Sequence, residues 1–372
     1  MKIIRINEPK IIMSNPTSKH NYFAWPTIAR LQDGKLAVVA SGFRLQHICP
    51  FGKAVISFSA DDGDSYTLPS PVIDTPLDDR DAGVLPFGEN GVMVTSFNNA
   101  LEFQTNIAER SNTKAYRLSY LDLVSKEEEE RYLGSTFRVS FDGGVTFGEV
   151  CKSPITSPHG PIQRKNGEII WVGRTFSPKD SITDYDRIKA YRLHPQNGEM
   201  EYLGCIDEIF SEGEKQLSCE PCVLELEDGT LLCHIRVQTP KSINRILFTI
   251  YQSTSSDGGK TWSKPEPIMP KLGGAPAHII RHSSGLLISV YGFRGSPYGI
   301  KPFGIKAMFS RDNGKTWDTD YSIFTSEVSE DIGYPSTVEL PDGSLLTVFY
   351  AKESKDSPAV IMQQKWRFED EI

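Results

Sequence analysis

The chain has 372 residues, of which 38% are hydrophobic, and its formal net charge at pH 7 is −8. This length admits one large domain or two average ones, and the sequence has no run of about 18 apolar residues that would span a membrane. The acidic balance argues against nucleic acid, which is bound through basic faces. The net charge does not exclude a small anionic substrate, because a few local arginines can dominate the charge of a pocket. We expect no nucleic acid and no membrane as partners.

The first five residues carry positive charge but no apolar segment of a signal peptide follows them. We expect a cytoplasmic protein, or a secreted or periplasmic one if a signal peptide has been removed. Six cysteines are too few for a disulfide framework at this length. Cys219 and Cys222 form a C-x-x-C pair, but no second pair follows at zinc spacing. We therefore expect buried free thiols, no metal and no cofactor.

In chain order, a short apolar segment at residues 3–6 is followed by six units in which two apolar runs flank a turn with glycine. The units are residues 28–40, 84–97, 162–173, 223–236, 279–294 and 338–350. Their turn glycines recur every 56 to 76 residues, which leaves room for two more strands per unit. The last run, residues 359–368, is expected to pair with residues 3–6 and close a ring.

Four segments share the pattern S-x-D-x-G-x-[ST]-aromatic, and each follows one of these units. They are residues 59–66, 140–147, 255–262 and 310–317. Asp and Ser side chains cap turn amides, glycine takes the positive φ, and the aromatic ring packs under the turn. The third unit has the turn Pro195 to Met200 instead.

Four-stranded repeats of about 40–60 residues are typical of propeller blades. The sequence therefore predicts an all-β protein, a six-bladed β-propeller of four-stranded antiparallel blades. We expect one domain over residues 1–372, with insertions near 100–135 and 176–216. The acidic run at residues 127–130 is interpreted as a solvated face.

The start of each first strand and the end of each second strand are expected to meet at one mouth of the propeller axis. The strand starts carry Trp25, the run Asp79-Arg80-Asp81, His159, Glu220, His278 and Tyr334, and four strand ends carry Arg44, Arg174, Arg236 and Arg294. Taken singly, an arginine at a strand end is more often a surface residue. A single tyrosine usually packs in the core or at the rim, and a single histidine is as often a structural residue as a functional one. Taken together, they predict a pocket for a ligand with a carboxylate.

The four Asp-box hairpins in a six-unit all-β chain resemble those of the sialidases, or neuraminidases, over essentially the whole sequence. The resemblance implies a retaining glycosidase with a tyrosine nucleophile, because the substrate's own carboxylate repels a second anion. It also implies a Glu that takes the tyrosine proton, three arginines that hold the carboxylate, and an Asp as general acid and base. Tyr334 looks like the nucleophile, Glu220 like the base, and Arg236 and Arg294 like two of the three arginines.

The first blade departs from the sialidase pattern in two ways. Where sialidases have [FY]-R-I-P, this chain has Phe23-Ala24-Trp25-Pro26, and residues 36–59 contain no Asp or Glu. We expect Arg44 to replace the missing arginine in part, and Trp25 to offer a stacking face to a sugar ring. Proton transfer is assigned to His47, Asp79 or Asp81, the histidine for its ordinary pKa near 6.5 and the aspartates for burial. His159, His278 and Arg174 are expected to bind substrate.

The function expected from these residues is removal of a terminal acidic sugar, either sialic acid or a related keto-deoxy sugar acid. A uronic acid at a chain end is a further possible substrate. Two different functions stay open beside it. One is a lyase that uses a histidine and a tyrosine to abstract a proton beside a uronate, and the second is a propeller that binds glycans without catalysis.

Overall fold

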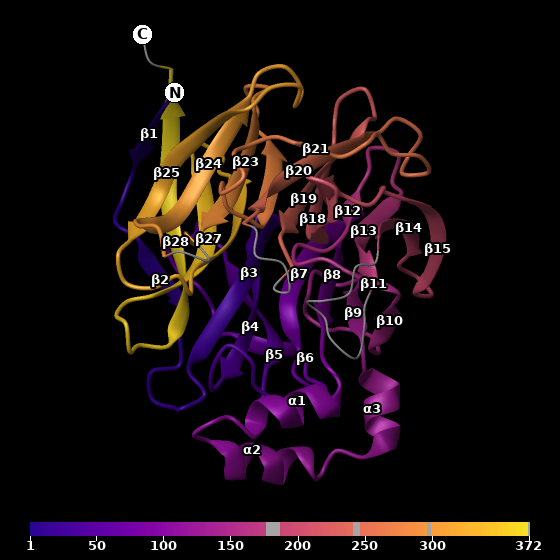
Figure 1. The fold of residues 1–372 in the computed structure, drawn as a ribbon, viewed down its shortest axis with the longest axis vertical. Helices are drawn as coiled ribbons and strands as arrows, with labels where there is room; N and C mark the ends of the chain where they lie inside the picture. The colour runs from indigo at the N-terminus through magenta and orange to yellow at the C-terminus, as the bar shows by residue number, and fades with distance from the viewer. Residues whose placement is uncertain (176–186, 241–245, 296–298, 371–372) are drawn as a thin grey trace.

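A computed structural model describes residues 1–175, 187–240, 246–295 and 299–370. The described strands form six antiparallel sheets of four or five strands, arranged as the blades of a propeller, and one separate two-stranded hairpin (Figure 1). The six-bladed all-β fold predicted from the sequence is thus confirmed. No helix among the described residues is long and apolar enough to cross a membrane.

The first three blades follow one another along the chain, and each runs outward from the propeller axis. Blade 1 consists of β3 (Tyr22–Arg30), β4 (Leu36–Arg44), β5 (Lys53–Ser59) and β6 (Ser70–Ile73). Blade 2 consists of β7 (Arg80–Phe87), β8 (Gly91–Phe97), β9 (Ser135–Ser140) and β10 (Cys151–Ser153). Blade 3 consists of β11 (Ile155–Thr156), β12 (Ile162–Gln163), β13 (Ile169–Thr175), β14 (Ile188–His194) and β15 (Glu199–Cys205).

The remaining blades repeat this order after a small hairpin of β16 (Phe210–Ser211) and β17 (Glu214–Lys215). Blade 4 consists of β18 (Leu217–Glu225), β19 (Leu231–Gln238), β20 (Phe248–Ser255) and β21 (Glu266–Pro267). Blade 5 consists of β22 (Ala277–Arg281), β23 (Leu287–Phe293), β24 (Phe303–Ser310) and β25 (Asp318–Ser326). Blade 6 contains β26 (Gly333–Glu339), β27 (Leu345–Lys352) and β28 (Ala359–Glu369).

The two ends of the chain close the ring in blade 6. Strands β1 (Lys2–Arg5) and β2 (Lys10–Met13) both pair antiparallel with β28, so that Lys2 lies opposite Glu369 in one sheet (Figure 1). The inner strands β26 and β3 pack against each other across this closure. The ring order therefore equals the chain order, and blades 3 and 6 lie on opposite sides of the axis.

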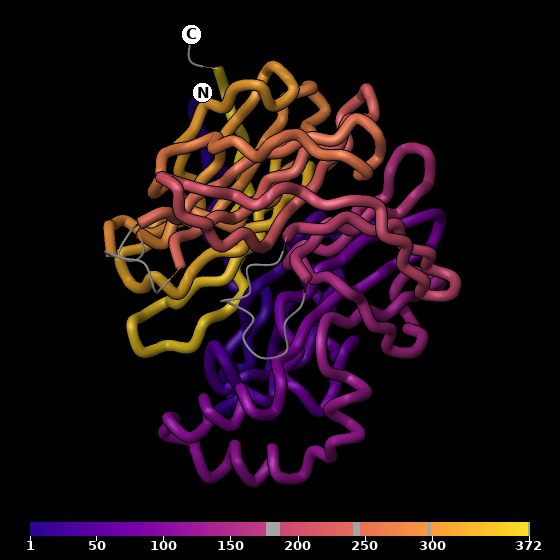
Figure 2. The backbone as a smooth tube through the Cα atoms, turned by 45° about the vertical axis from the view of Figure 1, so that its right-hand side comes forward, coloured from indigo at the N-terminus to yellow at the C-terminus, as the bar shows by residue number. Residues whose placement is uncertain are grey.

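Residues 100–134 add a helical insertion between β8 and β9 of blade 2. It contains α1 (Leu101–Ala108), α2 (Lys114–Leu121) and α3 (Lys126–Tyr132), which project from the body beside the first two blades (Figure 2). Helix α3 begins with a capping box, in which the side chains of Ser125 and Glu128 each bond the other's backbone amide. The acidic run at residues 127–130 lies in this helix. Of the insertion expected near residues 176–216, residues 176–186 lie outside the described part of the chain, and residues 188–205 provide the two outer strands β14 and β15 of blade 3.

The Asp boxes connect the third and fourth strands of blades 1, 2, 4 and 5, and they share one hydrogen-bond pattern. In the box of blade 4, Asp257 accepts bonds from the Thr261 amide at 2.9 Å and the Thr261 hydroxyl at 2.6 Å, while Gly259 N donates to Ser255 Oγ at 2.8 Å. These bonds lower the pKa of the Asp257 carboxyl to about 2. The Asp and Ser side chains of each box thus accept hydrogen bonds from the amides of its own turn, as the sequence pattern predicts.

Candidate active site

A cavity of about 410 Å³ opens at the end of the propeller axis where the first strands begin. Seven of the twelve site residues predicted from the sequence line it: His47, Asp81, Arg174, Glu220, Arg236, Arg294 and Tyr334. The lining also includes Arg80, which the sequence pattern did not assign to the site. The walls between these polar groups are apolar, with Phe97, Leu217, Leu247 and Phe248. The volume lies within the usual range for small-molecule sites.

Four of the inner strands have a bulge near their start, with one residue of positive φ. The bulge turns the side chain of that residue toward the cavity or toward the side chains packed beneath it. Trp25, Asp81, Glu220 and Tyr334 have φ values of 55°, 49°, 50° and 50°, in the left-handed region that non-glycine residues rarely adopt. Each lies where the register between the first two strands of its blade shifts. Such bulges redirect side chains beside functional sites, at about 1–3 kcal/mol of strain each.

Tyr334 and Glu220 form the central contact of the cavity. The Tyr334 hydroxyl donates a 2.5 Å hydrogen bond to Glu220 Oε1, and Arg236 Nη1 donates to Glu220 Oε2 at 2.6 Å and to the Tyr334 oxygen at 3.3 Å. Burial opposes the charge of Glu220, but Arg236 and the Tyr334 hydrogen bond together lower the pKa of this carboxyl. Burial and the Glu220 charge raise the pKa of Tyr334 well above its ordinary value. At neutral pH the pair is thus a phenol that donates to a carboxylate.

Arg294 holds the other side of the Tyr334 ring. Its guanidinium carbon lies 5.3 Å from the centre of that ring, within the range of a cation–π contact. The Arg294 Nε atom donates to the Ile332 carbonyl at 2.8 Å, and Nη2 donates to the Tyr350 hydroxyl at 2.8 Å. These two bonds fix the plane of the guanidinium, with Arg236 on the neighbouring blade.

Asp81 supplies the second carboxyl group of the cavity. Its side chain is buried, and its Oδ1 atom has no hydrogen-bond partner among the described residues. Burial raises the pKa of Asp81 to about 7, with Arg80 acting in the opposite direction and Glu220 in the same one. A carboxyl group with this pKa is half protonated at neutral pH, which suits both donation and acceptance of a proton.

Arg80 reaches the cavity from the start of β7, immediately before Asp81. Its guanidinium carbon lies 4.5 Å from the centre of the Trp25 ring and 5.6 Å from that of Phe97. The Arg80 Nε atom has no hydrogen-bond partner among the described residues. Blade 2 thus brings a guanidinium over the ring of Trp25, the residue that follows Ala24 in blade 1. The prediction from the sequence took arginines only from strand ends, although the run Asp79-Arg80-Asp81 places one at a strand start.

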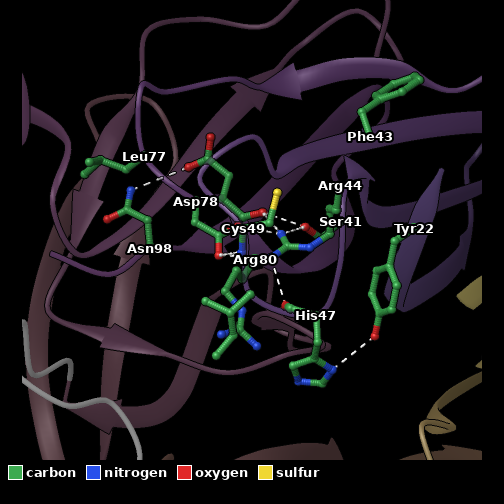
Figure 3. Close-up of polar contacts among 12 residues, drawn as sticks. Tyr22, Ser41, Phe43, Arg44, His47, Cys49, Leu77, Asp78, Arg80 and Asn98 are labelled. Atoms are coloured by element: carbon green, nitrogen blue, oxygen red, sulfur yellow. Dashed lines mark hydrogen bonds and ion pairs between the residues drawn. The ribbon is translucent and has the colours of Figure 1, made fainter. Parts of the chain in front are cut away.

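Arg44, Asp79 and Trp25 do not line the cavity, although all three were predicted site residues. Arg44 is fully buried and forms a 2.6 Å ion pair with Asp78, toward which its side chain points in Figure 3. Asp79 is also fully buried and accepts bonds from the Thr75 amide at 2.7 Å and the Thr75 hydroxyl at 2.9 Å. Trp25 is only 1% exposed, beneath the Arg80 guanidinium. A carboxylate clamp, a proton donor and a stacking face all need exposed atoms, which these side chains lack.

His47 lies at the rim, whereas the other two predicted histidines lie beneath the cavity. His47 Nδ1 is 3.0 Å from the Tyr22 hydroxyl and 3.3 Å from Asp331 Oδ1 (Figure 3 shows the Tyr22 contact). His159 and His278 do not line the cavity, and their rings contact each other edge-to-face at 4.9 Å. Burial lowers the pKa of His278 to about 4 and that of His159 well below its ordinary value, so both are neutral.

The helical insertion packs on the loop that carries His47. Phe51 of this loop stacks on Tyr116 with ring centres 4.9 Å apart, and Arg117 Nη1 donates to the Ile48 carbonyl at 3.1 Å. Arg44 Nη2 donates to the His47 carbonyl at 2.9 Å from the opposite side. Residues 45–52 are therefore held between the first blade and the helices, which fixes the rim of the cavity.

The fold agrees with comparisons to known proteins. The model of the BNR repeat-like domain family matches residues 124–348, more than half of the chain. The chain therefore belongs to this family. A comparison with curated protein sequences gave no significant match.

Solved structures share the fold at low sequence identity. A Dyadobacter fermentans protein of unknown function is 18% identical, with a TM-score of 0.73 and 99% of both chains covered. The NanB sialidase of Streptococcus pneumoniae is 13% identical, with a TM-score of 0.65, and the match covers 97% of this chain and 70% of that one. An α-L-arabinanase of Penicillium chrysogenum is also 13% identical, with a TM-score of 0.60 and 98% of both chains covered. The chain thus has the propeller fold of these glycosidases.

Proposed function

We propose that this protein is a glycoside hydrolase that releases a terminal acidic sugar, sialic acid or a related keto-deoxy sugar acid, with Tyr334 as the nucleophile. The observation that carries the proposal is the 2.5 Å hydrogen bond from the Tyr334 hydroxyl to Glu220, inside a cavity lined by arginines. A tyrosine is a weak nucleophile until a base removes its proton, and Glu220 is ionised and in contact with that proton.

In the first step the Tyr334 oxygen bonds to the anomeric carbon of the sugar while its proton passes to Glu220. The bond from that carbon to the leaving-group oxygen breaks, and this oxygen takes the proton of Asp81. In the second step a water oxygen bonds to the anomeric carbon as Asp81 accepts one of its protons. The bond to Tyr334 breaks, and the phenol regains its proton from Glu220. Both carboxyl groups thus return to their starting states.

The charges of the cavity support an acidic sugar as the substrate. Four arginines (Arg80, Arg174, Arg236 and Arg294) face two carboxyl groups, of which Asp81 is half protonated at neutral pH. The planar fork of arginine matches a carboxylate with two parallel hydrogen bonds. Arg236, Arg294 and Arg80 surround Tyr334 and Trp25 from three blades, where the carboxylate of a bound sugar acid is expected.

The test is hydrolysis of a fluorogenic sialoside and of a panel of other acidic glycosides by the wild type and by Tyr334→Phe. We expect release of the acidic sugar by the wild type, and a fall in kcat of at least about 10³-fold in Tyr334→Phe, which lacks the attacking oxygen. Tyr202→Phe, at an exposed position of β15, is the matched control and should keep full activity. Full activity of Tyr334→Phe would show that the nucleophile is assigned wrongly.

A second candidate is a glycosidase for a neutral sugar that works with two carboxyl groups. The different pKa directions of Asp81 and Glu220 favour it, since one group is a proton donor and the other an ionised base or nucleophile. In that case Tyr334→Phe retains activity on neutral pentosides such as an arabinoside, whereas Glu220→Gln loses it.

A lyase and a propeller without catalytic activity have less support. A lyase needs an exposed base at the cavity. His159 is buried, His278 is half-buried, and neither lines the cavity, which leaves His47 at the rim. Lyase chemistry would yield an unsaturated product that absorbs in the ultraviolet. A non-catalytic propeller would bind the sugar acid without turnover, and Tyr334→Phe would leave its affinity unchanged.

A further inference from the structure

The cavity contains one arginine that the proposed reaction does not use. Arg174 ends β13 in blade 3, and Tyr334 begins β26 in blade 6, so the two lie on opposite sides of the propeller axis. The Arg174 side chain is nine-tenths buried yet lines the cavity. Its Nη1 atom has no hydrogen-bond partner within the described part of the chain. A buried donor without a partner is costly, so such an atom in a cavity marks a place for a ligand acceptor.

Further polar groups line the same cavity as Arg174. Thr156 is its partner in the pairing of β11 with β13, and Thr156 and Ser157 both line the cavity. Thr239 lines it from the end of blade 4, and its buried hydroxyl also lacks a hydrogen-bond partner among the described residues. The charge of Arg174 lowers the pKa of Asp81, but no ion pair joins the two side chains among the described residues. Arg174 therefore carries a charge that no described carboxylate neutralises by direct contact.

We propose that Arg174, with Thr156 and Thr239, forms a second anion subsite, and that the ligand of this cavity is a sugar acid with two anionic groups. One carboxylate binds beside Tyr334 between Arg236 and Arg294. The second group, a carboxylate or a sulfate ester, binds across the axis at Arg174. This inference rests on the proposed function, since it names the substrate class of the same site.

The balance of charge in the cavity supports a dianion. Four arginines oppose one ionised carboxylate, Glu220, together with the half-protonated Asp81. One ligand carboxylate leaves the excess of positive charge only partly neutralised, and a second anion reduces it further. The apolar side chains of Phe97, Leu217 and Phe248 line the space between the polar groups and exclude water from them. Charge-assisted hydrogen bonds are stronger in such surroundings.

The experiment compares three probes by isothermal titration calorimetry at pH 6.5: D-glucuronate with one carboxylate, D-glucarate with two, and D-glucuronate 2-sulfate with a carboxylate and a sulfate ester. The protein variants are Arg174→Met, Arg174→Lys and Arg192→Met. Arg192 lies on β14 of the same blade and outside the cavity, paired with Glu201, and its variant is the matched control.

We expect the wild type to bind at least one dianion about 10-fold more tightly than glucuronate, which is the effect of one charge-assisted hydrogen bond. Arg174→Met should remove this preference and leave glucuronate binding unchanged, Arg174→Lys should keep part of it, and Arg192→Met all of it. Preference for glucarate alone identifies a carboxylate, and preference for the sulfated probe alone identifies a sulfate ester.

Three results would overturn the inference: equal affinity for all three probes, no dianion binding up to 10 mM, or an equal loss of all three probes in Arg174→Met. The last result would place Arg174 at the first carboxylate instead. The proposed function fails separately. A wild type that binds a dianion through Arg174 but hydrolyses no glycoside contradicts the hydrolase alone, and one that hydrolyses acidic glycosides with no role for Arg174 contradicts the second subsite alone.

Discussion

Arg44 and Asp78 form an ion pair, with 2.6 Å between Arg44 Nη1 and Asp78 Oδ1, and neither side chain has any exposed surface. The same guanidinium donates to the His47 carbonyl at 2.9 Å (Figure 3). It also donates to the Asp79 carbonyl at 3.4 Å. It therefore ties the rim loop to the segment that leads into Arg80 and Asp81. A residue predicted to hold substrate instead holds two segments of the site together.

Breaking this pair should destabilise the protein strongly. Arg44→Met leaves the Asp78 charge buried without its partner, and we expect a loss of about 3–5 kcal/mol in the free energy of unfolding. Urea denaturation measures it. Arg44→Met combined with Asp78→Asn should be more stable than Arg44→Met alone, because the double variant has no unpaired buried carboxylate at position 78.

The control for this prediction is Arg192, a partly exposed side chain that pairs with Glu168 at 2.8 Å and with Glu201 at 2.5 Å. Arg192→Met should cost at most about 1 kcal/mol, since solvent screens exposed ion pairs. A similar loss in Arg44→Met and Arg192→Met would contradict the structural role of Arg44.

Glu220 is expected to act on the rate of reaction through Tyr334. Glu220→Gln keeps the size of the side chain but cannot take the phenol proton, so kcat for an acidic glycoside should fall by about 10²–10⁴-fold. Steady-state kinetics measures this, and calorimetric binding of the sugar acid shows that the pocket is intact. A variant with kcat within a factor of about three of the wild type would exclude Glu220 as the base.

Arg80 is expected to act as the arginine that the first blade lacks. Arg80→Met removes a guanidinium that stands over Trp25 with an unpaired Nε atom. We expect the KM for an acidic glycoside to rise by about 10-fold or more, the effect of one hydrogen bond to a charged group. Arg30→Met, at the last residue of β3 and outside the cavity lining, is the control and should leave the KM unchanged. Unchanged KM values in both variants would place the substrate carboxylate elsewhere.

The sequence was sufficient to predict the blades and the residues whose direction the backbone decides. Glycine turns and Asp boxes are local patterns, and Glu220 and Tyr334 begin strands at equivalent points of blades 4 and 6. The strand position of Arg44 was predictable but its direction was not, because Asp78, 34 residues away, determines it. Arg80 was missed because arginines were sought only at strand ends, whereas this one begins β7. The helix at residues 126–132 had a readable signal, the capping box of Ser125 and Glu128.

The pH dependence of the reaction should report the protonation of Asp81. Burial raises the pKa of this carboxyl from about 4 to about 7, and the first step needs its proton on the leaving group. The proton is present below pH 7 and is lost as the pH rises through that value, so kcat/KM should fall about 10-fold per pH unit above 7. At low pH the rate should fall only below the pH range in which a glutamate ordinarily titrates, because the pKa of Glu220 is lowered.

Asp81→Asn should remove the alkaline fall and lower the maximal rate by about 10²–10⁴-fold. Its loss should be smaller for an aryl glycoside, whose leaving group departs without a proton. An alkaline fall that persists in Asp81→Asn would assign the acid to another group, with His47 at the rim the next to test.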